Sequence, residues 1–183
     1  MRNLILVAFV EPVAEGAVFL RTEWPLHITL VRFDVGAPAG DSAQDGPSGA
    51  DLDGVAEHVA ALAAPHAEAA LGAGLTVGVD AGFGRNGSVP VSLIQPQQDL
   101  QNLHEQLVAV VGSLAGRVLT PAHTLSGYRP HVSHHGDKRL DPGAAVVLDR
   151  IALVDMAPDG DRTVRRVLRL WSRNETAEEN PRR

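Results

Sequence analysis

Cysteine is absent from this sequence, and aromatic residues make up only 4% of it. Without cysteine the chain cannot contain disulfides, thiolate zinc sites or a cysteine nucleophile. Long apolar runs are missing as well. Glu11 and Pro12 end the apolar segment at residues 4–10 before it reaches the length of a signal peptide or a membrane span. We therefore expect a first β-strand at this point, and a cytoplasmic protein without membrane contact.

An excess of positive charge is also missing. The formal net charge is -6 at pH 7, so no global positive field would draw the protein onto a phosphate backbone. A nucleic-acid ligand would have to be held locally, by its end or as a small fragment. Near the C-terminus five arginines recur, which a solvated strand face explains more simply than a phosphate-binding patch. They are Arg162, Arg165, Arg166, Arg169 and Arg173.

Enough apolar sequence remains for a folded domain. The 183 residues are 44% hydrophobic and 21% charged, a globular composition that requires no metal or disulfide to fold. The apolar patterns predict strands, a helix, strands, a second helix and further strands, in that order. The expected strands lie at residues 3–10, 17–21, 26–35, 75–80, 89–94, 117–119, 131–133, 145–156 and 163–171.

Two helices are expected between these strands. The first is capped by Asp51 and ends or kinks at Pro65, and its apolar stripe consists of Leu52, Val55, Val59 and Leu62. The second covers residues 97–115, with a structural histidine, His104, at the border of its stripe. That stripe consists of Leu100, Leu103, Leu107, Val111 and Leu114.

The domain organisation follows from composition. Residues 36–51 contain only Gly, Ala, Pro, Ser, Asp and Gln, which predicts a mobile surface loop. Residues 174–183 form a polar tail. The remaining elements predict an α+β protein, a single domain over residues 1–173, built from two similar lobes whose sheets face each other across a cleft.

Each predicted lobe carries one copy of the same small motif. A histidine is followed two positions later by a hydroxyl residue, as His27 and Thr29 in one copy and His131 and Ser133 in the other. Both copies have β-branched or apolar neighbours that favour a strand. Because side chains alternate along a strand, the imidazole and hydroxyl of each copy point to one face.

A pair of histidines on opposite walls of a cleft can act as general acid and general base. Imidazole titrates near neutrality, so one ring can be protonated while the other is neutral. A phosphodiester suits this arrangement, because the two hydroxyls can donate hydrogen bonds to its non-bridging oxygens. No metal or cofactor is needed for such chemistry.

At this point the sequence resembles a known family. His27-Ile28-Thr29-Leu30 and His131-Val132-Ser133-His134 are similar to the paired H-x-[ST]-x motifs of the 2H phosphoesterases. The most similar branch is the bacterial 2′-5′ RNA ligase and RNA 2′,3′-cyclic phosphodiesterase (LigT-like) group. Trp24 shortly before the first motif and Tyr128-Arg129-Pro130 before the second add to the resemblance, which spans roughly residues 1 to 173.

The resemblance implies a bilobal fold and metal-independent opening of 2′,3′-cyclic phosphates to 2′-phosphates, with RNA ends or small cyclic nucleotides as ligands. Joining of RNA ends through a 2′-5′ linkage would be related chemistry. By motif, His27 would be the general acid and His131 the general base, and Thr29 and Ser133 would hold the phosphate. Further candidates for substrate contact are Arg32, Tyr128 and Arg129. No obligate protein partner is implied.

Other interpretations remain open at this point. The second motif continues into His134-His135-Gly136-Asp137, where the family more often has an apolar residue. Strand alternation turns His134 away from His131, which favours a structural or surface role. The alternatives are a metal site built from His131, His134, His135 and Asp137, a non-catalytic module of the same fold that binds nucleotides or RNA ends, and two unrelated core histidines.

Overall fold

The computed structural model of the chain describes residues 1–36 and 49–173, and the predicted polar tail and nearly all of the predicted mobile loop lie outside these residues. Ten strands form one antiparallel sheet in the order β2-β10-β9-β1-β3-β7-β5-β4-β8, and β6 pairs with β3. The strands are β1 (Arg2–Phe9), β2 (Val18–Leu20), β3 (His27–Val35), β4 (Gly74–Phe83), β5 (Val89–Ile94), β6 (Arg117–Val118), β7 (His131–Ser133), β8 (Ala145–Val147), β9 (Arg150–Asp155) and β10 (Val164–Ser172).

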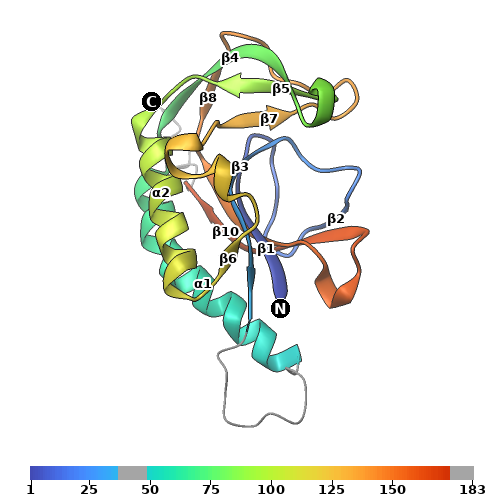
Figure 1. The fold of residues 1–183 in the computed structure, drawn as a ribbon, viewed down its shortest axis with the longest axis vertical. Coiled ribbons are helices and arrows are strands. Elements are labelled where there is room, and N and C mark those ends of the chain that lie inside the picture. Colours follow the sequence, from blue (N-terminus) through green and yellow to red (C-terminus); the bar gives the residue numbers. More distant parts are fainter. Residues whose placement is uncertain (37–48, 174–183) are drawn as a thin grey trace, which may run out of the picture.

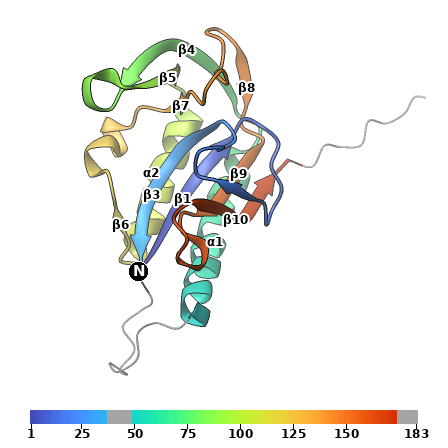
Figure 2. The same ribbon diagram turned by 90° about the vertical axis from the view of Figure 1, so that its right-hand side faces the viewer.

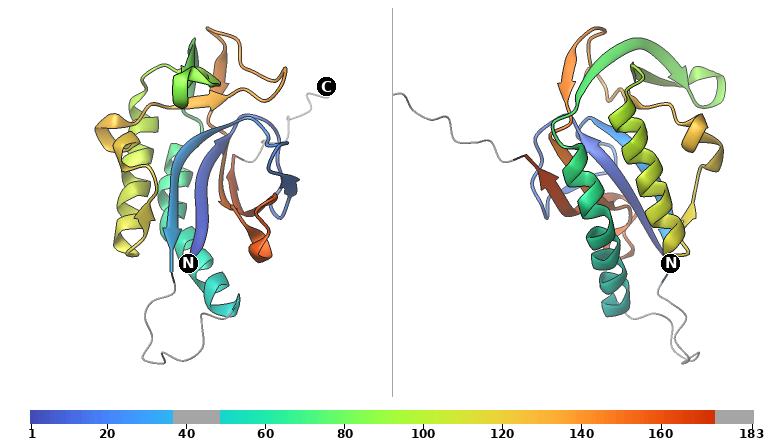
Figure 3. Two further views of the ribbon diagram at one scale, coloured as in Figure 1. Left: turned by 45° about the vertical axis from the view of Figure 1, so that its right-hand side comes forward. Right: turned by 90° about the vertical axis from the view of Figure 1, so that its left-hand side faces the viewer.

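The sheet is curled, and both helices cover the same face of it (Figure 1). Strands β4, β5, β7 and β8 curve over the end of β1 and β3, as the turned view in Figure 2 shows. The helices α1 (Gly49–Ala70) and α2 (Gln98–Ser113) lie side by side on one side of the sheet in both views of Figure 3, where α2 contacts β3 and α1 contacts β10. Neither of these helices, in the part of the chain that the structure describes, is long and apolar enough to cross a membrane.

Alternation along the strands divides the apolar residues into two cores. The larger core lies between the sheet and the helices and includes Leu4, Leu6, Ile28 and Leu103. A smaller cluster lies on the other face of the sheet and contains Ile5, Val7, Phe9, Trp24, Ala152, Val154, Met156 and Val167. The second face is therefore partly apolar, and it is also the face on which the histidine motifs lie.

The α+β class is confirmed, but the two halves are arranged differently from the prediction. Instead of two facing sheets, the N-terminal and C-terminal motif strands pair directly, with Ile28 opposite Val132. That pairing joins the two halves edge to edge, and the cleft is the concave face of one continuous sheet. Ile28 and Val132 are 104 positions apart in the chain. No local sequence pattern indicates that two strands so far apart will pair, so this pairing could not be predicted.

Helix α1 departs from the predicted pattern in three ways. It begins at Gly49 instead of Asp51, and it continues past Pro65 to Ala70. Leu62, predicted to be buried, is 37% exposed. The helix instead buries small residues, which allows it to lie close to the sheet: Ala56, Ala60, Ala63 and Ala67. Pro65 lies on the exposed side, where its missing N–H and its ring disturb the core least.

The segment predicted as one strand at residues 145–156 is two strands. β8 pairs with β4 at one edge of the sheet, whereas β9 lies between β1 and β10. The following turn is as predicted, because Asp159 and Gly160 both have positive φ, 54° and 82°, and connect β9 to β10.

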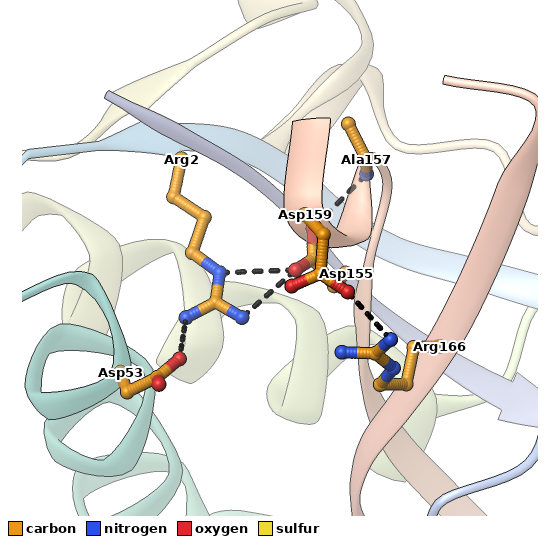
Figure 4. Close-up of polar contacts among 6 residues, drawn as sticks. All are labelled: Arg2, Asp53, Asp155, Ala157, Asp159 and Arg166. Atoms are coloured by element: carbon orange, nitrogen blue, oxygen red, sulfur yellow. Dashed lines mark hydrogen bonds and ion pairs between the residues drawn. The ribbon is translucent and has the colours of Figure 1, made fainter. Parts of the chain in front are cut away.

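Two of the five C-terminal arginines form ion pairs at the surface. Arg166 pairs with Asp159 at 2.8 Å (Figure 4), and Arg169 pairs with Glu57 at 3.0 Å. Arg165 is different, because only 7% of it is exposed.

Candidate active site

The two histidine motifs lie on neighbouring strands and face the same way. Ile28 and Val132, the middle residues of the motifs, are opposite each other and fully buried against the helices. Their flanking residues therefore point to the concave face. In an antiparallel pair this register places His27 beside Ser133 and Thr29 beside His131, with the two histidines on a diagonal whose Cβ atoms are typically about 7–8 Å apart. A phosphate group can fit between rings at that separation.

The concave face contains a cavity of about 890 Å³, and all seven side chains singled out in the sequence line it. They are His27, Thr29, Arg32, Tyr128, Arg129, His131 and Ser133. The structure thus brings the two motifs and their candidate contacts into one space, although the motifs are separated by about a hundred residues.

His27 and His131 are held by the same hydrogen bond. In each, Nδ1 lies 2.8 Å from the carbonyl oxygen two residues earlier, that of Pro25 for His27 and that of Arg129 for His131. A carbonyl only accepts, so Nδ1 must carry the hydrogen, and Nε2 is left to gain or lose a proton. Both rings are therefore oriented with the same nitrogen available for proton transfer.

The surroundings of the two rings differ. The His27 ring packs beside Trp24 and Phe9, with ring centres 4.3 Å and 5.9 Å away. Burial lowers the pKa of His27 to about 4, against the hydrogen bond to Pro25 and with a smaller contribution from the charges of His135 and His131. Burial also lowers the pKa of His131, with Arg129 and His123 adding to the effect. In the ligand-free protein both rings are therefore neutral at pH 7.

The hydroxyls of Thr29 and Ser133 are half-buried beside these rings. Both border the cavity. Neither side chain has a hydrogen-bond partner within residues 1–36 and 49–173. Each hydroxyl can therefore donate to a ligand in the cavity without breaking an existing bond.

A β-bulge brings Arg32 to the same face. Val7 pairs with Thr29 but Leu6 pairs with Val31, so Leu30 is an extra residue in β3. Leu30 and Val31 are consequently both buried against the helices, and the alternation of β3 changes phase after them. Strict alternation from His27 would have placed Arg32 on the helix side. The bulge instead places it beside Ile5 on the cavity face.

Tyr128 helps to position the motif strands through contacts with Thr29 and His104. Its hydroxyl donates to the Thr29 carbonyl at 2.9 Å, and its ring stacks on His104 with ring centres 3.8 Å apart. His104 is in turn fixed, since its Nδ1 donates to the Leu30 carbonyl and its Nε2 accepts the Leu125 N–H. Burial raises the pKa of Tyr128 and lowers that of His104. Both side chains therefore position the motif strands and remain neutral.

Arg129 lines the cavity beside Phe83 and His131. Its guanidinium carbon is 5.0 Å from the centre of the Phe83 ring, and that ring also packs against His131, with centres 4.4 Å apart. A cation over an aromatic face is held without being neutralised. Arg129 thus keeps its positive charge at the cavity.

Several cavity residues were not found from the sequence. Phe83, His123, His135 and Arg21 all border the space, and the His135 ring centre is 6.5 Å from that of His27. His135 returns to the site because the chain turns at Gly136, whose φ is 59°, and residues 135 and 138 form a bridge. Alternation continued from His131 and Ser133 places His135 on the same face, and this was the available signal.

The alternative metal site is not assembled. The His134 ring hydrogen-bonds Ser92 at 2.9 Å, on the buried side of β5, as alternation predicted. Within the described ranges no group of three or more His, Asp or Glu side chains lies close enough to hold a metal ion. The four residues of the proposed metal site therefore do not converge.

No protein-family model matches this sequence, and no curated protein is significantly similar to it. Solved structures do match. Escherichia coli LigT complexed with NADP+ has a TM-score of 0.53 at 14% identity, over 93% of this chain and 96% of LigT. LigT complexed with 3'-AMP has a TM-score of 0.52 at 16% identity, over 95% and 99% of the two chains. A structure described as a phosphoesterase has a TM-score of 0.50 at 15% identity, over 93% and 97%. The chain therefore has the LigT-like 2H phosphoesterase fold.

Proposed function

We propose that this protein is a metal-independent cyclic phosphodiesterase that opens 2′,3′-cyclic phosphates at RNA ends or on small nucleotides to 2′-phosphates. One observation carries the proposal. His27 and His131 come from separate halves of the chain, yet their Nδ1 atoms make equivalent hydrogen bonds at one cavity. Equivalent fixation of two imidazoles, each with a hydroxyl neighbour, is what acid–base catalysis at one phosphorus requires.

The reaction would proceed by in-line attack of water. His131, neutral at Nε2, takes a proton from the water as its oxygen bonds to phosphorus. The bond from phosphorus to the 3′-oxygen breaks, and protonated His27 gives its Nε2 proton to that oxygen. The products are a 3′-hydroxyl and a 2′-phosphate, and one proton has passed from water to the leaving oxygen. Run in reverse with an RNA hydroxyl in place of water, similar steps would join ends through a 2′-5′ linkage.

Thr29 and Ser133 would hold the reacting phosphate. Their hydroxyls donate to its non-bridging oxygens, where negative charge increases in the transition state. Arg129, whose charge is not neutralised, would stabilise the same oxygens from the wall beside His131.

The low pKa of His27 limits when this residue can act as the general acid. In the empty site His27 has the pKa of about 4, so it holds a proton poorly. A bound phosphate carries negative charge, which raises the pKa of a neighbouring imidazole. His27 can therefore serve as the acid once substrate is bound, and proton uptake would accompany binding.

The ligands in the similar structures support the proposal that this protein binds a nucleotide. The two LigT structures are complexes with NADP+ and with 3'-AMP, so that protein accommodates nucleotides with the same fold. An RNA partner for the present chain is our proposal and follows from the cyclic-phosphate chemistry.

The test is hydrolysis of adenosine 2′,3′-cyclic phosphate in the presence of EDTA, followed by ³¹P NMR. We expect turnover that EDTA does not affect and a 2′-phosphate as product. His27→Ala and His131→Ala should each lower kcat by about 10²–10⁴-fold, the usual contribution of a general acid or base. His123→Ala, at the border of the same cavity, is the matched control and should retain most activity.

Three results would contradict the proposal in different ways. Loss of activity in EDTA would indicate a metal-dependent reaction. Binding of the nucleotide without turnover by the wild-type protein would indicate a binding module. Full activity in both alanine variants would show that the two rings are not the acid and base.

A further inference from the structure

One end of the cavity, beside Trp24, carries positive charge that the proposed reaction does not use. Arg21 and Arg32 both border the cavity there. The Arg21 side chain has no ion pair with any residue in the described ranges. Arg32 donates its Nε and one terminal nitrogen to Asn3 Oδ1, at 3.3 Å and 3.1 Å. That acceptor is neutral, so the charge of Arg32 is positioned but not cancelled.

A third arginine lies behind the same tryptophan. The guanidinium carbon of Arg165 is 5.9 Å from the centre of the Trp24 ring, and only 7% of the residue is exposed. One terminal nitrogen donates to the carbonyls of Met156, Arg162 and Val164. Its Nε is buried without a hydrogen-bond partner, and no carboxylate among the described residues forms an ion pair with it.

Arg165 lies close to the two cavity arginines. Arg21, Arg32 and Trp24 line the same cavity, and Arg165 packs against Trp24. Burial lowers the pKa of Arg165, and the charges of Arg21 and Arg32 lower it further. Like charges gathered at a partly buried place are unfavourable unless an anion joins them.

Nearby carboxylates are occupied elsewhere. The negative charge of Asp155 raises the pKa of Arg165 and so partly offsets its burial. However, Asp155 Oδ2 accepts two hydrogen bonds from Arg2, at 3.1 Å and 2.8 Å, and Oδ1 accepts the Ala157 N–H (Figure 4). Asp34 accepts from Asn3 and forms an ion pair with Arg117, and these contacts lower its pKa more than the charge of Arg32 does. The arginine cluster therefore remains positive, in a protein whose net charge is -6.

The position of the cluster relative to the reacting phosphate suggests its ligand. The Trp24 ring contacts both regions, with its centre 4.3 Å from that of the His27 ring and 5.9 Å from the guanidinium carbon of Arg165. A phosphate held by Arg21 and Arg32 would lie in the same cavity as a phosphate between His27 and His131. Planar guanidinium groups suit phosphate oxygens, because their N–H groups match the spacing of two acceptors.

We propose that Arg21 and Arg32, backed by the buried charge of Arg165, form a second anion site that holds the neighbouring phosphate of the substrate. The inference rests on the proposed function and refines it. The favoured substrate is a 2′,3′-cyclic phosphate at the end of a chain with a further phosphate, and a nucleoside cyclic monophosphate is a poorer one.

The kinetic test compares two substrates, the dinucleotide ApA with a terminal 2′,3′-cyclic phosphate and adenosine 2′,3′-cyclic phosphate. For the wild type we expect kcat/KM to be at least about tenfold higher for the dinucleotide, the effect of one charge-assisted contact. Arg21→Ala and Arg32→Ala should each remove most of this preference, and Arg21→Ala should change the mononucleotide rate little. Arg32→Lys, which retains charge without the planar fork, should remove part of it.

The matched control is Arg173→Ala, which removes the same charge from an exposed position. The Arg173 guanidinium lies beside Gly72, outside the cavity lining. The control should keep the wild-type preference. Equal rates for the two substrates in the wild type, or an equal loss of preference in the Arg173 variant, would overturn the inference and leave the proposed function standing.

A binding measurement separates the two proposals. Calorimetry would compare adenosine 3′,5′-bisphosphate with adenosine 3′-monophosphate, neither of which needs to react. We expect the bisphosphate to bind at least about tenfold more tightly to the wild type, and Arg21→Ala and Arg32→Ala to reduce this difference. That result would support the second anion site even if no cyclic phosphate is hydrolysed. Equal affinities would overturn it even if hydrolysis is observed.

Discussion

At the scale of single residues, His27 and His131 share an orientation but not an environment. The same Nδ1 contact to a carbonyl fixes both rings. Trp24 and Phe9 surround His27, whereas His131 has a single aromatic neighbour, Phe83, and the charge of Arg129 nearby. Two chemically identical side chains are thereby given different proton affinities, which an acid and base pair needs.

This difference predicts the pH dependence of hydrolysis. The reaction requires one ring protonated and the other neutral, and the pKa of His27 is about 4 while that of His131 is lowered from 6.5. The competent form of the free enzyme is therefore most abundant between these values. It declines about tenfold per pH unit as pH rises above the higher pKa, because the acid loses its proton.

The measurement is kcat/KM for a 2′,3′-cyclic nucleotide from pH 4 to pH 9, with folding checked by circular dichroism at each pH. We expect a maximum on the acidic side of pH 6.5, with a steady decline through pH 8. A maximum above pH 7, or a rate independent of pH from 7 to 9, would show that the two imidazoles do not carry the protons as proposed.

At the scale of elements, irregularities in the strands and helices decide which residues meet. The extra residue Leu30 in β3 turns Arg32 toward the cavity. In α1, Val55 and Val59 are buried as periodicity predicted, but Leu62 is 37% exposed and alanines share the buried face. The bulge and the position of Leu62 are departures from ideal period, so they cannot be read from period alone.

The packing of α1 gives a stability prediction. Ala63 and Ala67 are 0% exposed in the core between the helices and the sheet, and a larger side chain would push the helix away from that core. Ala67→Leu should therefore lower the free energy of unfolding by about 1–3 kcal/mol, the usual cost of overpacking. Urea denaturation at pH 7 measures this.

Leu62→Ala is the matched control on the same helix. Leu62 is 37% exposed, so its truncation should change the free energy of unfolding by no more than about 0.5 kcal/mol. If the Leu62 variant were the less stable of the two, the alanine face would not be the packed face of α1.

At the scale of the whole molecule, the site exists only because the halves of the chain join through β3 and β7. Alternation around His27 and His131 was enough to predict which side chains share a face, and the order of strands and helices was enough for the α+β class. The joining itself was not predictable, since it depends on pairing between Ile28 and Val132. Long-range pairing also divides residues 145–156 into two strands, with β8 at one edge of the sheet and β9 between β1 and β10.

Residues that enter the cavity from turns were also beyond sequence reasoning. His123 and Arg21 border it, but neither belongs to a strand whose alternation could predict its direction. Arg165 was expected on a solvated strand face, yet it is buried behind Trp24. Its position depends on the smaller core, which forms only when β1, β9 and β10 are assembled.

The central claim is that His27 and His131 act together on one phosphorus atom. It is tested most directly by a crystal structure of the wild-type protein with a nucleoside 2′,3′-cyclic vanadate, a pentacoordinate analogue of the transition state. We predict vanadate oxygens about 2.7–3.2 Å from Nε2 of both histidines and from the hydroxyls of Thr29 and Ser133. A vanadate that contacts only one of the two rings, or that binds outside this cavity, would contradict the account.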